Sequence, residues 1–177
     1  MKLSLSICAA TSLLQTVVAG NYDFLYYTDL GCNSRAFGCR AIDPWVCCGS
    51  PPSASNYKTV KTNGGSASAV VLFTYDVDGH CGNCQSTAIL GKCYLNYPFS
   101  NGVIIAVSNP CQAWNAKLLA ADDGGGVRCN GKAALNFASV NGVNYTLPQG
   151  VEDEIGKDLV DLGDEEFGIK WAHLRDD

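Results

Sequence analysis

The sequence predicts a mainly β fold with one or two short helices, arranged as an antiparallel sheet sandwich stapled by disulfide bonds. Three observations support this prediction. Runs rich in β-branched and aromatic residues alternate with glycine, asparagine and proline, a pattern typical of short strands and turns. Ten cysteines occur among 177 residues. The chain opens on an apolar leader, which indicates an oxidising compartment where cysteines pair.

Residues 1–20 are predicted to be a secretory signal peptide. The first two residues carry one positive charge and lead into an apolar run containing small hydroxyl residues. Cleavage before Gly20 or before Asn21 fits the small or apolar residues that precede each. An uncleaved membrane anchor would need about 20 strongly apolar residues, and this run is shorter and more polar. We therefore expect a secreted, extracellular protein with no membrane span.

About 157 residues would remain, enough for one domain, and we place a cysteine-rich β domain at 21–150. Five strands are predicted in it, at 23–28, 68–75, 102–107, 134–140 and 143–147. Asn141-Gly142 separates the last two strands. Both positions of a two-residue hairpin turn need positive φ, and this dipeptide suits that requirement best. We therefore predict a β-hairpin there.

One helix is predicted within the β domain, near 110–121. Asn109 can cap it and Pro110 suits the first helical position, while three glycines from Gly124 onward end it. Its apolar residues recur at helical spacing and carry no ligand chemistry. We therefore expect a structural helix that covers one face of a sheet.

The acidic C-terminal segment, residues 151–177, is predicted to be partly helical. It holds ten acidic and three basic residues, a net charge of −7. Val151, Ile155, Leu159 and Leu162 recur at helical spacing and Gly163 would end that helix. Four large apolar residues follow, namely Phe167, Ile169, Trp171 and Leu174. We expect part of the segment to pack on the β domain, and a disordered acidic tail is the alternative.

Nine cysteines remain after the leader and are candidates for disulfide bonds: Cys32, Cys39, Cys47, Cys48, Cys81, Cys84, Cys93, Cys111 and Cys129. Their number is odd, so at least one is free or pairs with another molecule, and the connectivity stays open. Neighbouring residues of an extended chain point to opposite sides. Cys47 and Cys48 are therefore predicted to anchor two different bridges.

The stretch YDVDGHCGNC, residues 75–84, gathers carboxylates, an imidazole and thiols. A calcium loop would need an acid at position 80 and a glutamate at position 87, where histidine and threonine stand. A zinc site would need four ligands from this region, namely His80, Cys81, Cys84 and Cys93. Secreted thiols are usually oxidised before zinc binds them. We therefore predict a tight turn fastened by disulfides, with no metal and no cofactor.

Catalysis would have to centre on His80, the only histidine of the β domain, together with Asp76 or Asp78. The chain has no Gly-x-Ser-x-Gly motif to supply an activated serine. The β domain also contains no glutamate, so a carboxylate pair would need two aspartates. We predict that the protein is not an enzyme, and a small secreted hydrolase remains the alternative.

Asn144-Tyr145-Thr146 is the only Asn-x-Ser/Thr motif in the chain. In a secreted protein such a motif is an acceptor for N-linked glycosylation, and an occupied asparagine must face solvent. Asn144 is therefore a candidate glycosylation site, and an unmodified strand residue is the alternative.

Two stretches, YYTDLGCNSRAFGCRAIDPWVCCG (26–49) and VNGVNYTLPQG (140–150), resemble the small cysteine-rich secreted proteins of filamentous fungi, many of which are effector candidates. A weaker similarity is to β/γ-crystallin-like domains, a Greek-key fold that some fungal killer toxins share. YYTDLGCNS and GGSASAVVL carry that similarity. Cys32 and Ser34 depart from the family pattern, and the acidic pair before its calcium-binding serine is missing at Gly64-Gly65. Calcium binding is therefore not implied.

These observations predict a secreted, non-catalytic interaction protein with an effector-like role, the role being implied by the resemblance. Its partner would be an extracellular or host-surface protein or glycan. The β domain is close to electrically neutral and shows no basic stripe, so a nucleic acid is not expected to bind. Two alternatives stay open, a hydrolase and a killer-toxin-like protein. A membrane-active toxin would commonly use a basic amphipathic helix, which this sequence lacks.

Overall fold

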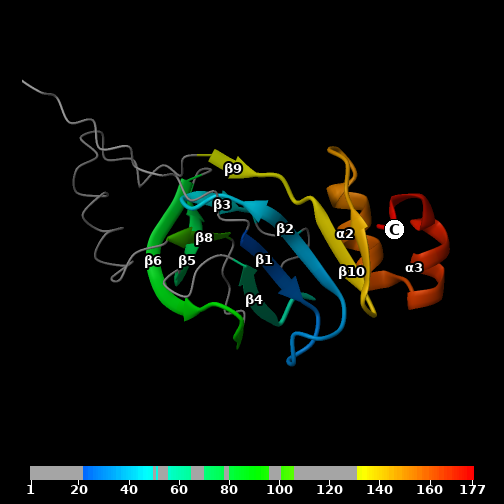
Figure 1. The fold of residues 1–177 in the computed structure, drawn as a ribbon, viewed down its shortest axis with the longest axis horizontal. Helices are drawn as coiled ribbons and strands as arrows, with labels where there is room; N and C mark the ends of the chain where they lie inside the picture. The colour runs from blue at the N-terminus through cyan, green and yellow to red at the C-terminus, as the bar shows by residue number, and fades with distance from the viewer. Residues whose placement is uncertain are drawn as a thin grey trace, which may run out of the picture.

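The computed structural model describes residues 22–49, 51, 56–64, 70–77, 80–95, 101–105 and 131–177. Over these residues the protein is mainly β, with a six-stranded sheet, a five-stranded sheet and two short α-helices (Figure 1). The predicted fold class is therefore confirmed, whereas a crystallin-like Greek key stays a prediction. The predicted leader at 1–20 and the predicted helix at 110–121 lie outside the described residues.

The six-stranded sheet is antiparallel throughout and has β1 near its centre, paired on both sides. Its strands in spatial order are β11 (Val143–Thr146), β10 (Phe137–Val140), β2 (Ala36–Ile42), β1 (Tyr22–Tyr27), β4 (Thr59–Gly64) and β7 (Cys93–Leu95). The predicted strands at 23–28 and 143–147 correspond to β1 and β11.

The five-stranded sheet contains the predicted strands at 68–75 and 102–107 as β5 and β8. Its strands in spatial order are β6 (His80–Ile89), β5 (Val70–Val77), β8 (Asn101–Ile105), β3 (Val46–Cys48) and β9 (Gly131–Ala133). The pairing of β3 with β9 is parallel, which departs from the purely antiparallel prediction. Strands β5 and β6 form a hairpin in which Val77 pairs with His80. The residues that connect the two strands, 78 and 79, lie outside the described residues, so the predicted turn in 75–84 stays a prediction.

The predicted hairpin at Asn141-Gly142 is confirmed. Asn141 has φ 51° and Gly142 has φ 80°, as a two-residue turn between β10 and β11 requires. The predicted strand at 134–140 is wrong at its start, because β10 begins only at Phe137. Just before it, Asn136 uses its side chain to bond the main chain of Arg40, accepting from its N–H at 2.7 Å and donating to its carbonyl at 3.2 Å. A side chain thus takes the place of regular strand pairing there.

The main core lies on one face of the six-stranded sheet. Side chains alternate along a strand, so Phe24 and Tyr26 of β1 point into this core while Leu25 and Tyr27 point to the opposite face. Aromatic residues from neighbouring strands and from the chain before β4 complete this core, including Phe37, Tyr57 and Tyr145.

Two helices of the C-terminal segment pack on that core, as Figure 1 shows for α2 (Glu152–Asp161) and α3 (Asp164–Lys170) beside β10. Ile155, Leu159 and Phe167 are fully buried and belong to the same cluster as the sheet residues. The predicted helix between Val151 and Gly163 is thus confirmed, and the segment packs on the sheet as expected. Ile169 differs from Phe167, because its side chain is 72% exposed to solvent.

The chain ends in a short 3₁₀ turn, Ala172–Leu174, after which Arg175 pairs with Tyr145 of β11. Trp171, just before this turn, is buried in the main core. Among the described residues, no helix is long and apolar enough to cross a membrane.

Candidate interaction surface

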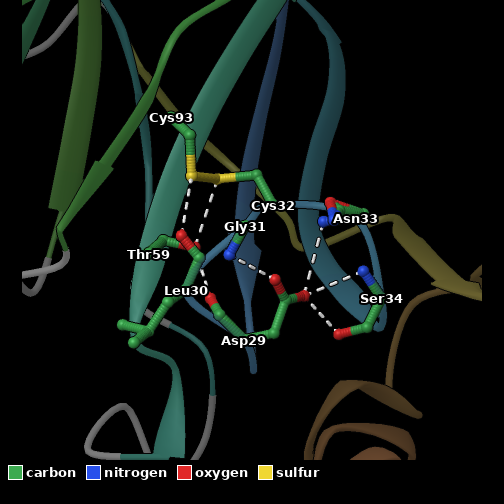
Figure 2. The surroundings of a disulfide bond; sticks show 8 residues. All are labelled: Asp29, Leu30, Gly31, Cys32, Asn33, Ser34, Thr59 and Cys93. Carbon is green, nitrogen blue, oxygen red and sulfur yellow. Dashed lines mark hydrogen bonds between the residues drawn. A yellow bond between two sulfur atoms is a disulfide. The ribbon is translucent and has the colours of Figure 1, made fainter.

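The loop between β1 and β2, residues 28–35, is organised around one carboxylate. Asp29 Oδ1 accepts a hydrogen bond from the Gly31 N–H at 2.5 Å, and Oδ2 accepts from the N–H groups of Asn33 at 3.4 Å and Ser34 at 2.8 Å. The Ser34 hydroxyl also donates to Oδ2, as Figure 2 shows. An aspartate that bonds main-chain amides just ahead of it is a standard device for fixing a turn. The loop therefore has a defined shape despite its exposure.

These hydrogen bonds change the acidity of the carboxyl group. Desolvation alone would raise the pKa of Asp29, but the hydrogen bonds from Ser34, Gly31 and Asn33 favour the charged form more strongly. The net result is a pKa lowered from its ordinary value. Asp29 therefore stays ionised and keeps the loop in place at neutral pH.

A disulfide between Cys32 and Cys93 fastens the loop to β7 (Figure 2). It joins residues 61 positions apart, so it closes a long stretch of chain. Cys32 is buried and lies in the left-handed region with φ 52°, whereas Cys93 is exposed. Thr59 of β4 contacts both the loop and the bridge. Its hydroxyl donates a hydrogen bond to the Asp29 carbonyl at 2.7 Å and lies 3.2 Å from Cys32 Sγ.

Two leucines are exposed beside this disulfide. Leu30 is 67% exposed and its carbonyl oxygen lies 3.6 Å from Cys93 Sγ. Leu95 is 62% exposed, pairs across the sheet with Thr59 and lies two residues after Cys93 on β7. We call Leu30, Leu95 and the Cys32–Cys93 bridge the leucine edge. Contiguous exposed apolar surface can mark a protein-binding site, and the leucine edge is the candidate for one among the described residues.

A small pocket of about 190 Å³ lies on the other side of the same loop. Its floor is apolar and buried, formed by Leu25, Tyr27 and Phe137 with Cys32 and Ala36, which together make a small buried cluster apart from the main core. Its rim is polar and includes Asn33 and Asn144. Ligand pockets for small molecules usually have volumes of about 300–1,000 Å³, so this pocket suits one small group only.

A second pocket, of about 360 Å³, lies where the end of β2 meets the chain before β10 and after β11. Two of its polar side chains, those of Asn136 and Glu152, are already engaged within the protein. Asn136 bonds the main chain of Arg40, and Glu152 accepts a hydrogen bond from the Gly150 N–H at 2.7 Å. These groups have little capacity left for a ligand, so the pocket is a weaker candidate than the leucine edge.

The predicted disulfide framework is present in two bridges, Cys32–Cys93 and Cys39–Cys48. The second bridge joins β2 of one sheet to β3 of the other, and both of its cysteines are fully buried. Cys47 is disulfide-bonded as well, and Cys48 is already paired with Cys39. The neighbouring cysteines therefore anchor two different bridges, as predicted.

The remaining candidate residues lie largely outside what the structure describes. Asp78, Cys111 and Cys129 are outside the described residues. Asp76, His80, Cys81 and Cys84 have a described backbone only, in β5 and β6, so the alternative of a hydrolytic centre at His80 is left untested. Within the described part of the chain, no group of three or more His, Cys, Asp or Glu residues could hold a metal ion.

Sequence reasoning missed the leucine edge, because nothing local distinguishes Leu30 or Leu95 from core leucines. The turn around Asp29, in contrast, has a recognisable pattern in the sequence. An aspartate followed by glycine two residues later and serine five residues later is a pattern that a carboxylate-centred turn would produce.

No family model, no curated protein and no solved structure matches this chain.

Proposed function

We propose that this protein is a secreted, non-catalytic interaction protein with an effector-like role, and that it binds an extracellular protein through the leucine edge. The observation that supports this proposal most strongly is the exposure of Leu30 and Leu95 beside a disulfide. An apolar side chain gains free energy when a partner buries it, at roughly 25 cal/mol per Å² of apolar surface. Two exposed leucines on one edge form a small anchor of that kind.

The rigidity of the loop also supports binding. The Cys32–Cys93 bridge, the Asp29 hydrogen bonds and the contact with Thr59 all hold the loop before any partner arrives. Ordering a flexible loop on binding would cost about 0.5–1.5 kcal/mol for each immobilised side chain. A preformed loop avoids most of that cost, so even a small apolar surface gives useful affinity.

The contacts of two described carboxylates favour binding over catalysis. Asp29 is committed to the loop, and the buried Asp158 of α2 accepts a hydrogen bond from Trp171 Nε1 at 3.0 Å and pairs with Lys170 at 2.5 Å. A catalytic carboxylate must lie within hydrogen-bond distance of a substrate atom that is bound in a cleft. Both groups instead serve structural contacts, and the predicted leader and the fungal resemblance support a role outside the cell.

The proposal is tested by affinity capture from extracellular extracts of a host or neighbouring organism. The wild-type protein is compared with the double variant Leu30→Glu, Leu95→Glu and with the control Ile169→Glu. Ile169 is exposed to a similar degree on α3, so the control places one glutamate at an exposed apolar position away from the leucine edge, against two in the double variant. We expect a set of proteins retained by the wild type and by the control and lost with the double variant.

Equal retention by all three proteins would contradict a role for the leucine edge. The hydrolase alternative is tested separately by screening the wild type on peptide, ester and glycoside substrates. Activity that disappears in His80→Ala would replace the binding proposal with an enzymatic one.

A further inference from the structure

Asn144 lies on β11, the outermost strand in the order of the six-stranded sheet, and its side chain is exposed. Two other groups of the Asn-x-Thr motif, a main-chain carbonyl and a hydroxyl, form hydrogen bonds within the protein. The Asn144 carbonyl accepts a hydrogen bond from the Asp176 N–H at 2.9 Å, and the Thr146 hydroxyl donates to the Asp176 carboxylate at 2.7 Å. Among the described residues, no hydrogen bond uses the side-chain amide of Asn144, which therefore remains available for modification.

The 190 Å³ pocket begins directly at this asparagine. Asn144 pairs with Ser139 of β10, and both residues line the pocket. Across the pocket from them are Asn33 and Ser34 of the disulfide-fastened loop. A group attached to the Asn144 amide would therefore start at the pocket rim and would be close to both walls.

We propose that Asn144 carries an N-linked glycan and that the first N-acetylglucosamine of this glycan occupies the pocket. The co-reactant is a lipid-diphosphate-linked oligosaccharide of the secretory pathway. The bond between Asn144 Nδ2 and sugar C1 forms, the bond between C1 and the diphosphate oxygen breaks, the amide loses one proton and the lipid diphosphate leaves. This inference rests on the secretion that the proposed function includes.

The chemistry of the pocket matches a single sugar ring. A pyranose has an apolar face of C–H groups, which fits the buried floor of Leu25, Tyr27 and Phe137. Hydroxyl and acetamido groups lie around its edge, and the rim offers the polar side chains of Asn33 and Ser139. A volume of about 190 Å³ is too small for an oligosaccharide, so the outer sugars would lie in solvent.

A sugar in this position would connect β11 to the loop between β1 and β2. It would exclude water from the apolar floor and limit the motion of residues 33–36. Removal of only the outer sugars should then have little effect on stability, whereas removal of the first sugar should lower it.

The experiment uses the full chain secreted from a eukaryotic host, with intact mass as the first readout. One portion is treated with an endoglycosidase that leaves a single N-acetylglucosamine, and another with an amidase that removes the whole glycan and leaves an aspartate. We expect the single-sugar form to unfold at the same temperature as the untreated glycoprotein. The sugar-free form should unfold about 2–4 °C lower, a shift of ordinary size for a chain of this length.

Two controls separate the sugar from other effects. Asn144→Asp reproduces the product of the amidase and should match the sugar-free form, including faster amide hydrogen exchange in residues 33–36. Asn144→Gln removes the acceptor without adding charge and should show the same lower melting temperature.

An unmodified Asn144 in the secreted protein would overturn this inference, and so would equal melting temperatures for the single-sugar and sugar-free forms. The outcomes that contradict the proposed function differ from those that contradict the glycan. A chain that retains its leader and is not secreted contradicts both proposals, whereas a secreted, cleaved chain with unmodified Asn144 contradicts only the glycan.

Discussion

Arg35 and Asp164 form an ion pair across 129 residues of sequence, with Arg35 Nε donating to Asp164 Oδ1 at 2.7 Å. The same guanidinium donates through Nη1 to the carbonyls of Leu159 at 2.7 Å and Leu162 at 2.6 Å. These carbonyls lie at the C-terminal end of α2, where the last turn leaves main-chain acceptors unpaired. One side chain of the loop between β1 and β2 thus holds both helices of the C-terminal segment.

Arg35→Ala should lower the free energy of unfolding by about 1.5–3 kcal/mol, the usual range for hydrogen bonds to a charged group. Arg35→Lys should recover little, because an ammonium cannot reproduce the forked geometry that serves a carboxylate and two carbonyls together. The measurement is urea denaturation followed by circular dichroism. Lys157→Ala, an exposed change on α2, is the matched control and should change stability by less than about 0.5 kcal/mol. Equal effects of Arg35→Ala and the control would rule out this role for Arg35.

Low pH should weaken the contacts that hold the C-terminal segment on the rest of the protein. Hydrogen bonding from Arg35 holds the pKa of Asp164 below its ordinary value of 3.8 despite some desolvation, and Asn141 lowers it further. A carboxyl group with a lowered folded-state pKa contributes stability above its unfolded pKa, and that stability is lost as the pH falls through the folded value. We therefore expect unfolding free energy to fall as the pH drops below about 4.

Asp164→Asn provides the comparison for this pH dependence. The variant should be less stable than the wild type at pH 7, and its stability should decline less steeply below pH 4. Asp29 contributes a decline of the same sign, since its pKa is also lowered. Parallel pH profiles for the wild type and Asp164→Asn would contradict the assigned role of Asp164.

Asp158 of α2 stabilises the packing between α2 and the residues at the end of α3. Its carboxylate accepts the hydrogen bond from the buried Trp171 indole, so Asp158→Ala would leave that N–H without its partner. We expect a loss of about 1–3 kcal/mol in unfolding free energy. Asp158→Asn keeps an acceptor oxygen and should lose less. Chemical denaturation followed by circular dichroism measures both, and Asp161→Ala at an exposed position of α2 is the control. A loss for Asp158→Ala no larger than for the control would refute the prediction.

The two described disulfides should differ in how readily they are reduced. Cys93 is exposed, whereas Cys39 and Cys48 are both fully buried. Thiol–disulfide exchange needs access of a thiolate to a sulfur atom. Limited dithiothreitol followed by alkylation and peptide mass mapping should therefore label Cys32 and Cys93 first. Earlier labelling of the buried pair would show that access does not decide the order.

The parts of the fold that sequence predicted are those with local causes. The Asn141-Gly142 turn needs only positive φ at two adjacent residues, and α2 needs only the spacing of Ile155 and Leu159. Strand β1 is a run of aromatic and apolar residues with a clear pattern. Each of these is visible within a few residues of sequence.

The parts that sequence reasoning missed depend on distant partners. Strands β4 and β7 are short or polar, and they become strands by pairing with β1 and with each other. The Cys32–Cys93 bridge is one of many pairings that nine cysteines allow, so no local pattern selects it. Leu30 and Leu95 are linked to each other only through that bridge and the sheet register, since the Leu30 carbonyl lies near Cys93 and Leu95 follows Cys93 on β7.

The most direct test of the leucine edge and its covalent support is disulfide mapping of the native secreted protein. Free thiols are blocked without reduction, the chain is digested, and linked peptides are identified by mass. The structure predicts one linked pair containing Cys32 and Cys93 and another containing Cys39 and Cys48, with no blocking label on these four residues. Label on Cys32 and Cys93 in the folded protein would contradict the braced loop and, with it, the proposed binding surface.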